Sequence, residues 1–206
     1  MPQLEADVTP EPARKGHWLA NEFAELWAVA KQLFGKWSFL NFTFGVTLAS
    51  FAGYGAGAFA VPYFIRAFGL NYAEVGLIFG LVGGASTGLG TLLGGFLTDW
   101  AGKRDVRWYA FIPAIGLTVA APLYVLVYQA PSWEMAAALL IIPGIFHYTY
   151  LGPTFGVMHN MVEARRRATA TAVLFFVLNL IALGGGPVFT GWLIDLLSSN
   201  AFLQTG

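Results

Sequence analysis

A histidine suited to proton or solute binding lies in the middle of a long apolar stretch. His147 is followed by Tyr148 and Tyr150 within residues 135–158, a run without lysine or arginine. An imidazole changes charge near neutral pH, and in an apolar environment it is costly unless it is paired or faces water. His147, with the two tyrosines beside it, is therefore a candidate substrate or proton site. The alternative is a neutral histidine that is hydrogen-bonded inside a helix bundle.

Other patterns argue against catalysis, cofactors and metals. The three histidines are widely separated and the chain has no cysteine, so we expect no metal cluster and no thiol chemistry. Lys103 is followed by Arg104 rather than by serine or threonine, which excludes a phosphate-binding loop. No convergent catalytic group is visible, so the sequence predicts neither an enzyme nor a bound cofactor. Asn179 is a further candidate polar group, which either faces a cavity or joins two helices.

The composition predicts that these residues lie in an apolar environment. Of the 206 residues, 57% are hydrophobic and 11% are charged, and the mean hydropathy is +0.63. A soluble domain typically has about 25% charged residues. This chain therefore cannot cover a globule of its size with a polar surface. The formal net charge of 0 gives no reason to expect a nucleic-acid partner.

The apolar residues are gathered in five runs of about 20 residues or more, the length needed to cross a bilayer. None of the runs contains lysine or arginine, and they cover residues 39–64, 72–97, 109–128, 135–158 and 169–193. The solvent face of a soluble helix would interrupt such a run every third or fourth residue. Helices satisfy their own backbone hydrogen bonds, for which hydrocarbon offers no partners. The sequence therefore predicts an all-α, polytopic bundle of five transmembrane helices in a lipid bilayer.

Basic residues predict how this bundle lies in the membrane. Ten of the eleven lysines and arginines fall on one side of a five-span arrangement, and only Arg66 falls on the other. Because basic loops stay cytoplasmic, we expect a multi-pass protein of the cell (inner) membrane with its N-terminus in the cytoplasm and its C-terminus outside. Tryptophans near the predicted span ends fit an aromatic belt: Trp37, Trp100, Trp108, Trp133 and Trp192.

Residues 1–35 differ from the rest and are predicted to be a cytoplasmic linker. Within residues 18–34, apolar side chains recur at helical spacing, and polar side chains lie on the other side. This pattern predicts an amphipathic helix, either lying on the inner membrane surface or packed on the bundle. The five-helix bundle then occupies residues 36–199, and residues 200–206 form a truncated tail.

Residues 94–104 read GGFLTDWAGKR and close an apolar run with an acid, a glycine and a basic pair. This segment resembles the G-x-L-x-D-x-x-G-[RK]-[RK] loop signature of the major facilitator superfamily. Residues 166–187 resemble the penultimate helix of that family, and residues 48–55 resemble its seventh helix in the spinster-like branch. The resemblance implies that the five spans match helices seven to eleven of a twelve-helix transporter. The first half would then be missing, and a twelfth helix would begin where the chain stops.

The resemblance also implies that the loop acts as a conformational latch, formed by Gly95, Asp99, Gly102, Lys103 and Arg104. Asp99 would accept hydrogen bonds from a helix N-terminus or pair with cations. Gly102 would permit a tight turn, and the basic pair would bind Asp99 or lipid phosphates. The alternative is a plain basic loop with one solvated acid.

Glycines and prolines predict where helices meet and bend. Four glycines recur every fourth residue, so they share one helix face that allows close approach of another helix: Gly76, Gly80, Gly84 and Gly88. By the resemblance, this face meets the missing N-terminal half, or a homodimer mate. Gly152 and Pro153 interrupt the fourth span. Gly186 and Pro187 interrupt the fifth and mark a candidate hinge.

Together these patterns predict the C-terminal half, as a natural half or a fragment, of a secondary active transporter of the major facilitator superfamily. It would move a small or amphipathic solute by alternating access. No ATP-hydrolysis element is visible, so coupling would use an ion gradient or none. The alternative is a non-transporting membrane scaffold or assembly subunit that pairs through its glycine-rich helix faces.

Overall fold

The computed structural model describes residues 18–205, with the side chains of residues 23–198. In this part of the chain every regular element is a helix: α1 (Trp18–Phe34), α2 (Trp37–Phe68), α3 (Tyr72–Gly102), α4 (Trp108–Tyr128), α5 (Trp133–Tyr148), α6 (Leu151–Met161), η1 (Ala164–Arg166), α7 (Arg167–Leu178), η2 (Asn179–Leu183) and α8 (Gly184–Thr205).

Five helical segments are long and apolar enough to cross a membrane: Trp37–Phe68, Tyr72–Gly102, Trp108–Tyr128, Trp133–Met161 and Ala164–Ser198. The predicted all-α fold with five spans is confirmed, and the amphipathic helix expected at residues 18–34 is present as α1. Residues 200–205, which were expected in a tail, continue the helix of the last span. Residues 1–17 of the expected linker lie outside the described residues.

The turn between the first two spans is short, and both helix ends next to it are capped. Gly69 follows α2 with a φ of 69°, and its N–H donates to the carbonyl of Ile65. This left-handed conformation carries no steric penalty for glycine. At the start of α3, Asn71 accepts from the backbone N–H groups of Ala73 and Glu74, and the Glu74 carboxylate accepts from the Asn71 N–H. This capping box satisfies donors that would otherwise lack partners.

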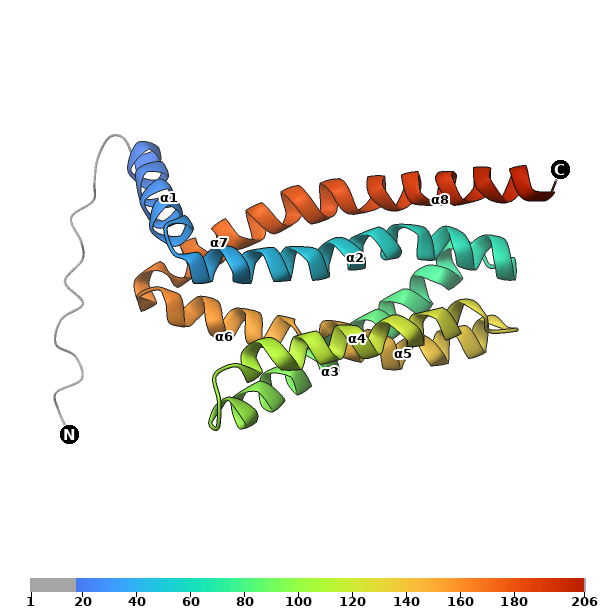
Figure 1. The fold of residues 1–206 in the computed structure, drawn as a ribbon, viewed down its shortest axis with the longest axis horizontal. Coiled ribbons are helices and arrows are strands. Elements are labelled where there is room, and N and C mark those ends of the chain that lie inside the picture. The colour runs from blue at the N-terminus through green and yellow to red at the C-terminus, as the bar shows by residue number, and fades with distance from the viewer. Residues whose placement is uncertain (1–17, 206) are drawn as a thin grey trace.

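The spans form two layers that share a long axis (Figure 1). α2 and α8 run side by side in one layer with α7, and α3, α4, α5 and α6 form the other. Near α1 the layers join through a buried cluster that contains Phe39, Met158 and Leu174. At the opposite end they join through a cluster that contains Phe64 and Val127. Apolar contacts therefore hold the layers together at both ends of the bundle.

Glycines bring α3 against α5 and α6 at backbone distance. A Cβ atom on Gly94 would overlap the backbone of Thr149, which lies just after α5. A Cβ atom on Gly152 would lie 2.6 Å from the backbone nitrogen of Gly95. Small residues permit such an approach, and the resulting van der Waals contact drives helix association in lipid.

Prolines explain the irregular segments of the last two spans. The fourth span is broken between Tyr148, the end of α5, and Leu151, the start of α6, just before Pro153. In the fifth span, η2 is a π-helix that ends at Leu183, four residues before Pro187. A proline cannot donate to the carbonyl four residues earlier, and its ring crowds that carbonyl. The predicted interruptions are therefore present, each of them slightly N-terminal to its proline.

α1 lies across one end of the bundle and is steeply inclined to the long axis of the spans (Figure 1). Val29 and Leu33 on α1 are completely buried in the cluster near Met158. Just after α1, the Nζ of Lys36 donates to the carbonyl of Met161 at 3.0 Å. One face of α1 therefore packs on the bundle.

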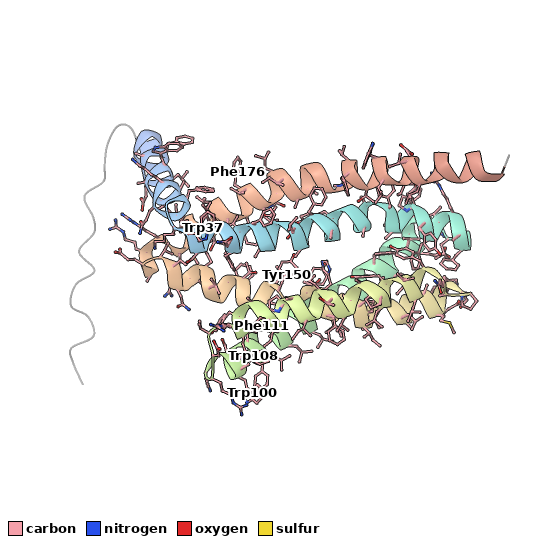
Figure 2. All side chains as sticks on the ribbon, viewed as in Figure 1. Trp37, Trp100, Trp108, Phe111, Tyr150 and Phe176 are labelled. Atoms are coloured by element: carbon pink, nitrogen blue, oxygen red, sulfur yellow. The ribbon has the colours of Figure 1, made fainter. Side chains whose placement is uncertain are left out.

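Basic residues and tryptophans gather at the α1 end. The loops and helix ends there carry eight of the described basic residues: Lys31, Lys36, Lys103, Arg104, Arg107, Arg165, Arg166 and Arg167. Arg66, in the last turn of α2, lies at the opposite end. Trp37, Trp100 and Trp108 also lie at the α1 end (Figure 2). A charge asymmetry of this kind is what sets the orientation of a membrane protein.

Gly94→Ala tests the crossing of α3 with the break in the fourth span. The added methyl group would overlap the Thr149 backbone, so we expect the free energy of unfolding to fall by about 1–3 kcal/mol. Gly84→Ala is the matched control, because a Cβ atom there has nothing within 4 Å. Thermal unfolding of the purified chain in detergent measures both variants. A Gly94→Ala midpoint equal to that of the unmodified chain would contradict the crossing.

Candidate functional site

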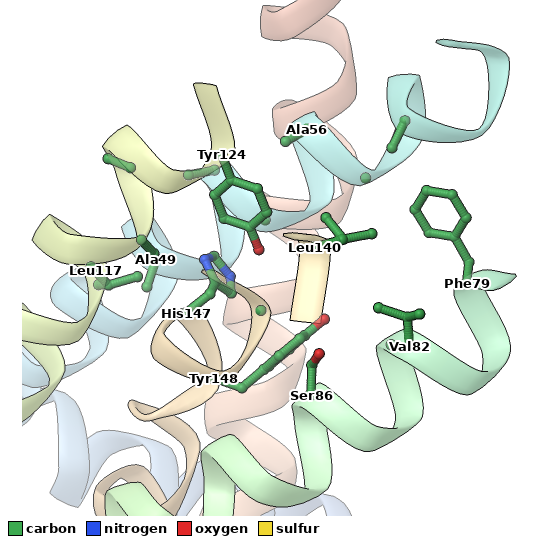
Figure 3. A pocket seen from close by; sticks show the side chains of 18 of the residues that line it. Ala49, Ala56, Phe79, Val82, Ser86, Leu117, Tyr124, Leu140, His147 and Tyr148 are labelled. Atoms are coloured by element: carbon green, nitrogen blue, oxygen red, sulfur yellow. The ribbon is translucent and has the colours of Figure 1, made fainter. Parts of the chain in front are cut away.

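A cavity of about 640 Å³ lies between the two layers and is lined by α2, α3, α4 and α5. Glycines and alanines of α2, among them Gly53 and Gly57, form one wall. His147, Tyr148 and Tyr124 bring polar atoms into an otherwise largely apolar lining (Figure 3). A concave apolar space with a few polar groups is the usual form of a small-molecule site.

His147 lies in this lining with 8% of its surface exposed. The ring centroids of Tyr124, Tyr148 and Tyr150 lie 6.2, 5.2 and 5.9 Å from that of the imidazole, each in a steeply inclined arrangement. A Cβ atom on Gly53 would lie 2.7 Å from Nε2, so only glycine at this position leaves the imidazole nitrogen its space. Three aromatic rings and the α2 backbone thus fix the orientation of the imidazole beside the cavity.

Tyr148 and Tyr150, which are close in sequence, have different surroundings. Tyr148 lines the same cavity as His147. Tyr150 is buried, and its hydroxyl lies 3.0 Å from that of Ser50 on α2. This hydrogen bond links the two layers at the break between α5 and α6.

Asn179 makes hydrogen bonds within the fold and is not part of the cavity lining. Its Nδ2 donates to the carbonyl of Phe175 at 2.7 Å, and its Oδ1 accepts from the hydroxyl of Tyr54 at 3.3 Å. This geometry joins α2 to η2. It corresponds to the interhelical alternative that the sequence left open for this residue.

A second cavity of about 520 Å³ extends the space between the layers toward the α1 end. It is lined by α2, α4 and α6, and it shares Gly45, Ala49 and Leu117 with the first cavity. The two cavities therefore form one groove that leads from His147 toward the basic end of the bundle.

Sequence patterns missed three residues of the site, namely Gly53, Ser86 and Tyr124. Ser86 lines the cavity while its Oγ donates to the carbonyl of Ile141 at 3.2 Å. Tyr124 lies within an apolar span and has no neighbour that marks it as special. The one available signal was the glycines and alanines that fill residues 52–58 except at Tyr54, which indicates a helix face that leaves space in front of it.

The latch residues lie where α3 turns toward α4, and their main partner is Tyr109. The hydroxyl of Tyr109 donates to the Asp99 carboxylate at 3.0 Å. A Cβ atom on Gly102 would lie 2.6 Å from Cε2 of the same tyrosine. Gly102 is the last residue of α3 and has no positive φ. Gly102 clears space for the Tyr109 ring, and a turn follows directly at residues 103–104, where the Arg104 N–H donates to the carbonyl of Ala101.

One member of the basic pair, Arg104, contacts an aromatic ring. The guanidinium of Arg104 lies 5.1 Å from the centre of the Trp100 ring, a cation–π contact. Among the described residues, no salt bridge joins Asp99 to Lys103 or Arg104. The remaining latch residue, Gly95, belongs to the helix crossing with α6 described above.

The four regularly spaced glycines of α3 make no contact with the other described helices. A Cβ atom on any of them would have nothing within 4 Å: Gly76, Gly80, Gly84 and Gly88. Gly186 behaves differently, since a Cβ atom there would lie 2.6 Å from the carbonyl oxygen of Phe51. Gly186 therefore brings α8 against α2, while the face formed by the four glycines is open.

The profile of the Major Facilitator Superfamily matches residues 31–206. The chain belongs to this family. An MFS-type efflux pump of Mycolicibacterium smegmatis is 32% identical to it over 172 residues, which are 84% of this chain and 40% of the pump. The sphingosine-1-phosphate transporter SPNS2 of Xenopus tropicalis is 29% identical over 126 residues, which are 60% of this chain and 25% of that protein.

Two crystal structures of a bacterial homologue of the human lysosomal transporter Spinster resemble this major facilitator chain. The inward-facing, unoccupied form has a TM-score of 0.75 and 32% identity, and the match covers 87% of this chain and 38% of that one. The inward-facing, occupied form has a TM-score of 0.63 and 29% identity, with 95% and 41% covered. These relatives place the chain in the spinster-like branch, as its motifs predicted. The chain spans 25% to 41% of their length.

The Ser50–Tyr150 hydrogen bond predicts a measurable coupling between the layers. Tyr150→Phe leaves the Ser50 hydroxyl without its buried partner, so we expect a loss of about 1–2 kcal/mol of unfolding free energy. In Ser50→Ala/Tyr150→Phe both hydroxyls are gone, and the double variant should be more stable than the sum of the single effects predicts. A double-mutant cycle of unfolding in detergent measures this coupling. Strict additivity would contradict the bond.

Proposed function

We propose that this chain is the C-terminal half of a secondary transporter that moves a small or amphipathic solute by alternating access. The observation that carries the proposal is the groove between the layers, with the His147 imidazole beside it in the middle of a span. In an apolar cavity an ionisable side chain provides the polar contact that can hold a solute or exchange a proton. The membership of the chain in a family of transporters supports the same conclusion.

The chemistry of the groove favours an amphipathic, lipid-like solute. Glycine, alanine, leucine and aromatic side chains dominate the lining, which suits an alkyl chain. The polar end of the solute would meet His147 and Tyr148, which project from the same wall (Figure 3). The name of the SPNS2 relative, a sphingosine-1-phosphate transporter, is compatible with a solute of this class.

The open glycine face of α3 is the surface on which we place the missing half. Four glycines without neighbours offer a second helix close backbone contact, and such contacts drive association in membranes. In the complete carrier, the substrate groove would lie between this half and its N-terminal counterpart. The same face would also suit the alternative function, a scaffold that pairs with a second copy, so only transport distinguishes the two.

We further propose that the α1 end faces the cytoplasm of the cell (inner) membrane, with the N-terminus inside and the C-terminus outside. The eight basic residues gathered at that end support this orientation. We place the bending point of the fifth span at η2 and Pro187, because backbone hydrogen bonds are irregular there. Gly186, next to Pro187, would be the point at which α8 pivots against α2.

Reconstitution with a supplied N-terminal half tests the transport function. The chain is placed in vesicles with and without the N-terminal six-helix half of the M. smegmatis efflux pump, and movement of a fluorescent sphingoid lipid is followed. We expect transport only when both halves are present. Dimerisation of this chain without transport in either preparation would favour the scaffold, and transport by the chain alone would contradict a half-carrier.

His147→Gln tests the site within the same assay. Loss of a hydrogen bond to a charged group costs about 1.4 kcal/mol, so we expect the apparent affinity for the lipid to weaken by about tenfold. His159→Gln is the matched control, because His159 lies on α6 and does not line the groove. Equal kinetics for the two variants would remove His147 from the site.

The latch predicts a change in rate rather than in affinity. Asp99→Asn and Tyr109→Phe both weaken the same 3.0 Å hydrogen bond. If this bond stabilises one conformation by about 1 kcal/mol, each variant should change the transport rate about fivefold. Asp99→Asn should do so at unchanged KM, because Asp99 does not line the groove, whereas Tyr109 does. The control is Asp105→Asn in the same loop, whose carboxylate accepts from the Arg107 backbone instead. Unaltered rates in both latch variants would make this a plain basic loop.

A further inference from the structure

Part of the apolar surface of α1 is buried against the bundle, and the rest of it is exposed. Val29 and Leu33 are fully buried against α6 and α7. Phe23 and Trp27, one helical turn apart, are 67% and 75% exposed. At 100° per residue, these two aromatic side chains point about a third of a turn away from the buried pair. A protein surface rarely exposes aromatic groups this large without a partner of their own.

The polar residues of α1 lie opposite these aromatic side chains. Glu25 and Gln32 fall about half a turn away from Phe23 and Trp27 on the helix circumference. The Oε1 of Gln32 accepts from the Nη1 of Arg166 at 3.1 Å, which ties this polar side to the basic turn after α6. The helix is therefore apolar on one side and polar on the other while one edge is fixed to the bundle.

The exposed aromatic surface continues onto the transmembrane helices. Trp37 at the start of α2 and Phe176 on α7 are 76% and 68% exposed, and both lie near the α1 end (Figure 2). α7 is part of a helical segment that is long and apolar enough to cross a membrane, and apolar surface exposed on such a segment is suited to contact with lipid. α1 crosses the bundle end at a steep angle to the spans (Figure 1), so its axis runs along the membrane surface rather than through it.

Charge at this end suits lipid headgroups. Lys31 on α1 is exposed, and Arg165 and Arg167 follow at the start of the fifth span. Basic side chains of this kind are attracted to anionic phosphates, while tryptophan prefers the boundary between headgroups and acyl chains. Aromatic groups on one face and basic groups beside them are the features of a helix that lies in the membrane interface.

We propose that α1 is a membrane-interface helix that inserts Phe23 and Trp27 into the headgroup–acyl boundary of the leaflet at the basic end, while Val29 and Leu33 hold it to the bundle. The sequence left two alternatives for this helix, one on the membrane surface and one packed on the bundle. In the proposed arrangement α1 does both. The function of such a helix would be to fix the depth and tilt of the half-carrier in the bilayer. It does not depend on transport.

Single-cysteine labelling tests this inference, since the chain contains no cysteine of its own. Phe23→Cys and Ala28→Cys are each made in the full chain, spin-labelled, and reconstituted in vesicles of phosphatidylcholine and phosphatidylglycerol. Ala28 is the matched control, because it is exposed on α1 away from the aromatic pair. Power-saturation EPR compares accessibility to oxygen, which enters the hydrocarbon, with accessibility to a water-soluble nickel chelate.

We expect the oxygen-to-nickel accessibility ratio to be several-fold higher at position 23 than at position 28. Trp27→Cys, with Phe23 intact, should give the same accessibility ratio as Phe23→Cys. This second variant shows whether loss of the Phe23 ring itself changes the result. Equal, water-like ratios at all three positions would overturn the proposal. If positions 23 and 27 lose accessibility to the nickel chelate only after the N-terminal half is added, the proposal is also overturned. A protein partner would then cover these two side chains.

Discussion

Close contact between helix backbones at glycines is the interaction on which the rest of this structure depends. In lipid, apolar side chains gain little by leaving their surroundings, so helices associate mainly through van der Waals contact. Gly94 against Thr149 and Gly152 against Gly95 provide it on one side of the molecule, and Gly186 against Phe51 on the other. Each contact brings the backbones of two helices so close that no side chain fits between them. The polar side chains on those spans are thereby fixed in position.

The groove follows from the way these two tightly packed units meet. The layers touch through apolar clusters at both ends, and in between the small residues of α2 leave space that no side chain fills. Tyr150 and Ser50 fix the distance between the layers at the middle of the bundle. His147 lies directly before Tyr148, the last residue of α5, so its position beside the groove depends on where the break in the fourth span falls. A packing contact and a proline together therefore place the histidine of the lining.

The outer surface of the described residues has two open apolar regions. Four glycines of α3 have open space in front of them, and aromatic side chains are exposed on α1 and α7. The latch between α3 and α4 lies at the same end as α1. Because Tyr109 reaches back over Gly102 to Asp99, movement of α4 relative to α3 would break this hydrogen bond. The hydrogen bond between α3 and α4 and the proposed membrane contacts of α1 therefore lie at the same, basic end of the bundle.

Much of the fold can be predicted from the sequence, because hydrocarbon imposes a simple rule on it. Five long apolar runs without basic residues must become helices, and the Gly–Pro pairs at 152–153 and 186–187 lie close to the irregular segments of two of them. The family motif at 94–104 adds the branch to which the chain belongs. These predictions rest on local composition and on backbone hydrogen bonding, which do not require knowledge of the partners of each helix.

The tertiary structure alone decided which polar residues share a site. Tyr148 and Tyr150 are two positions apart, yet Tyr148 lines the same cavity as His147, whereas Tyr150 lines the second cavity and bonds to Ser50. Asn179 is a polar residue of the kind that can line a cavity, but its side chain accepts a hydrogen bond from Tyr54. The apolar runs determined that the chain forms membrane helices, since burial in lipid depends on each segment by itself. The rotation of each helix about its axis depends on contacts between segments far apart in sequence, so only the packed structure set it.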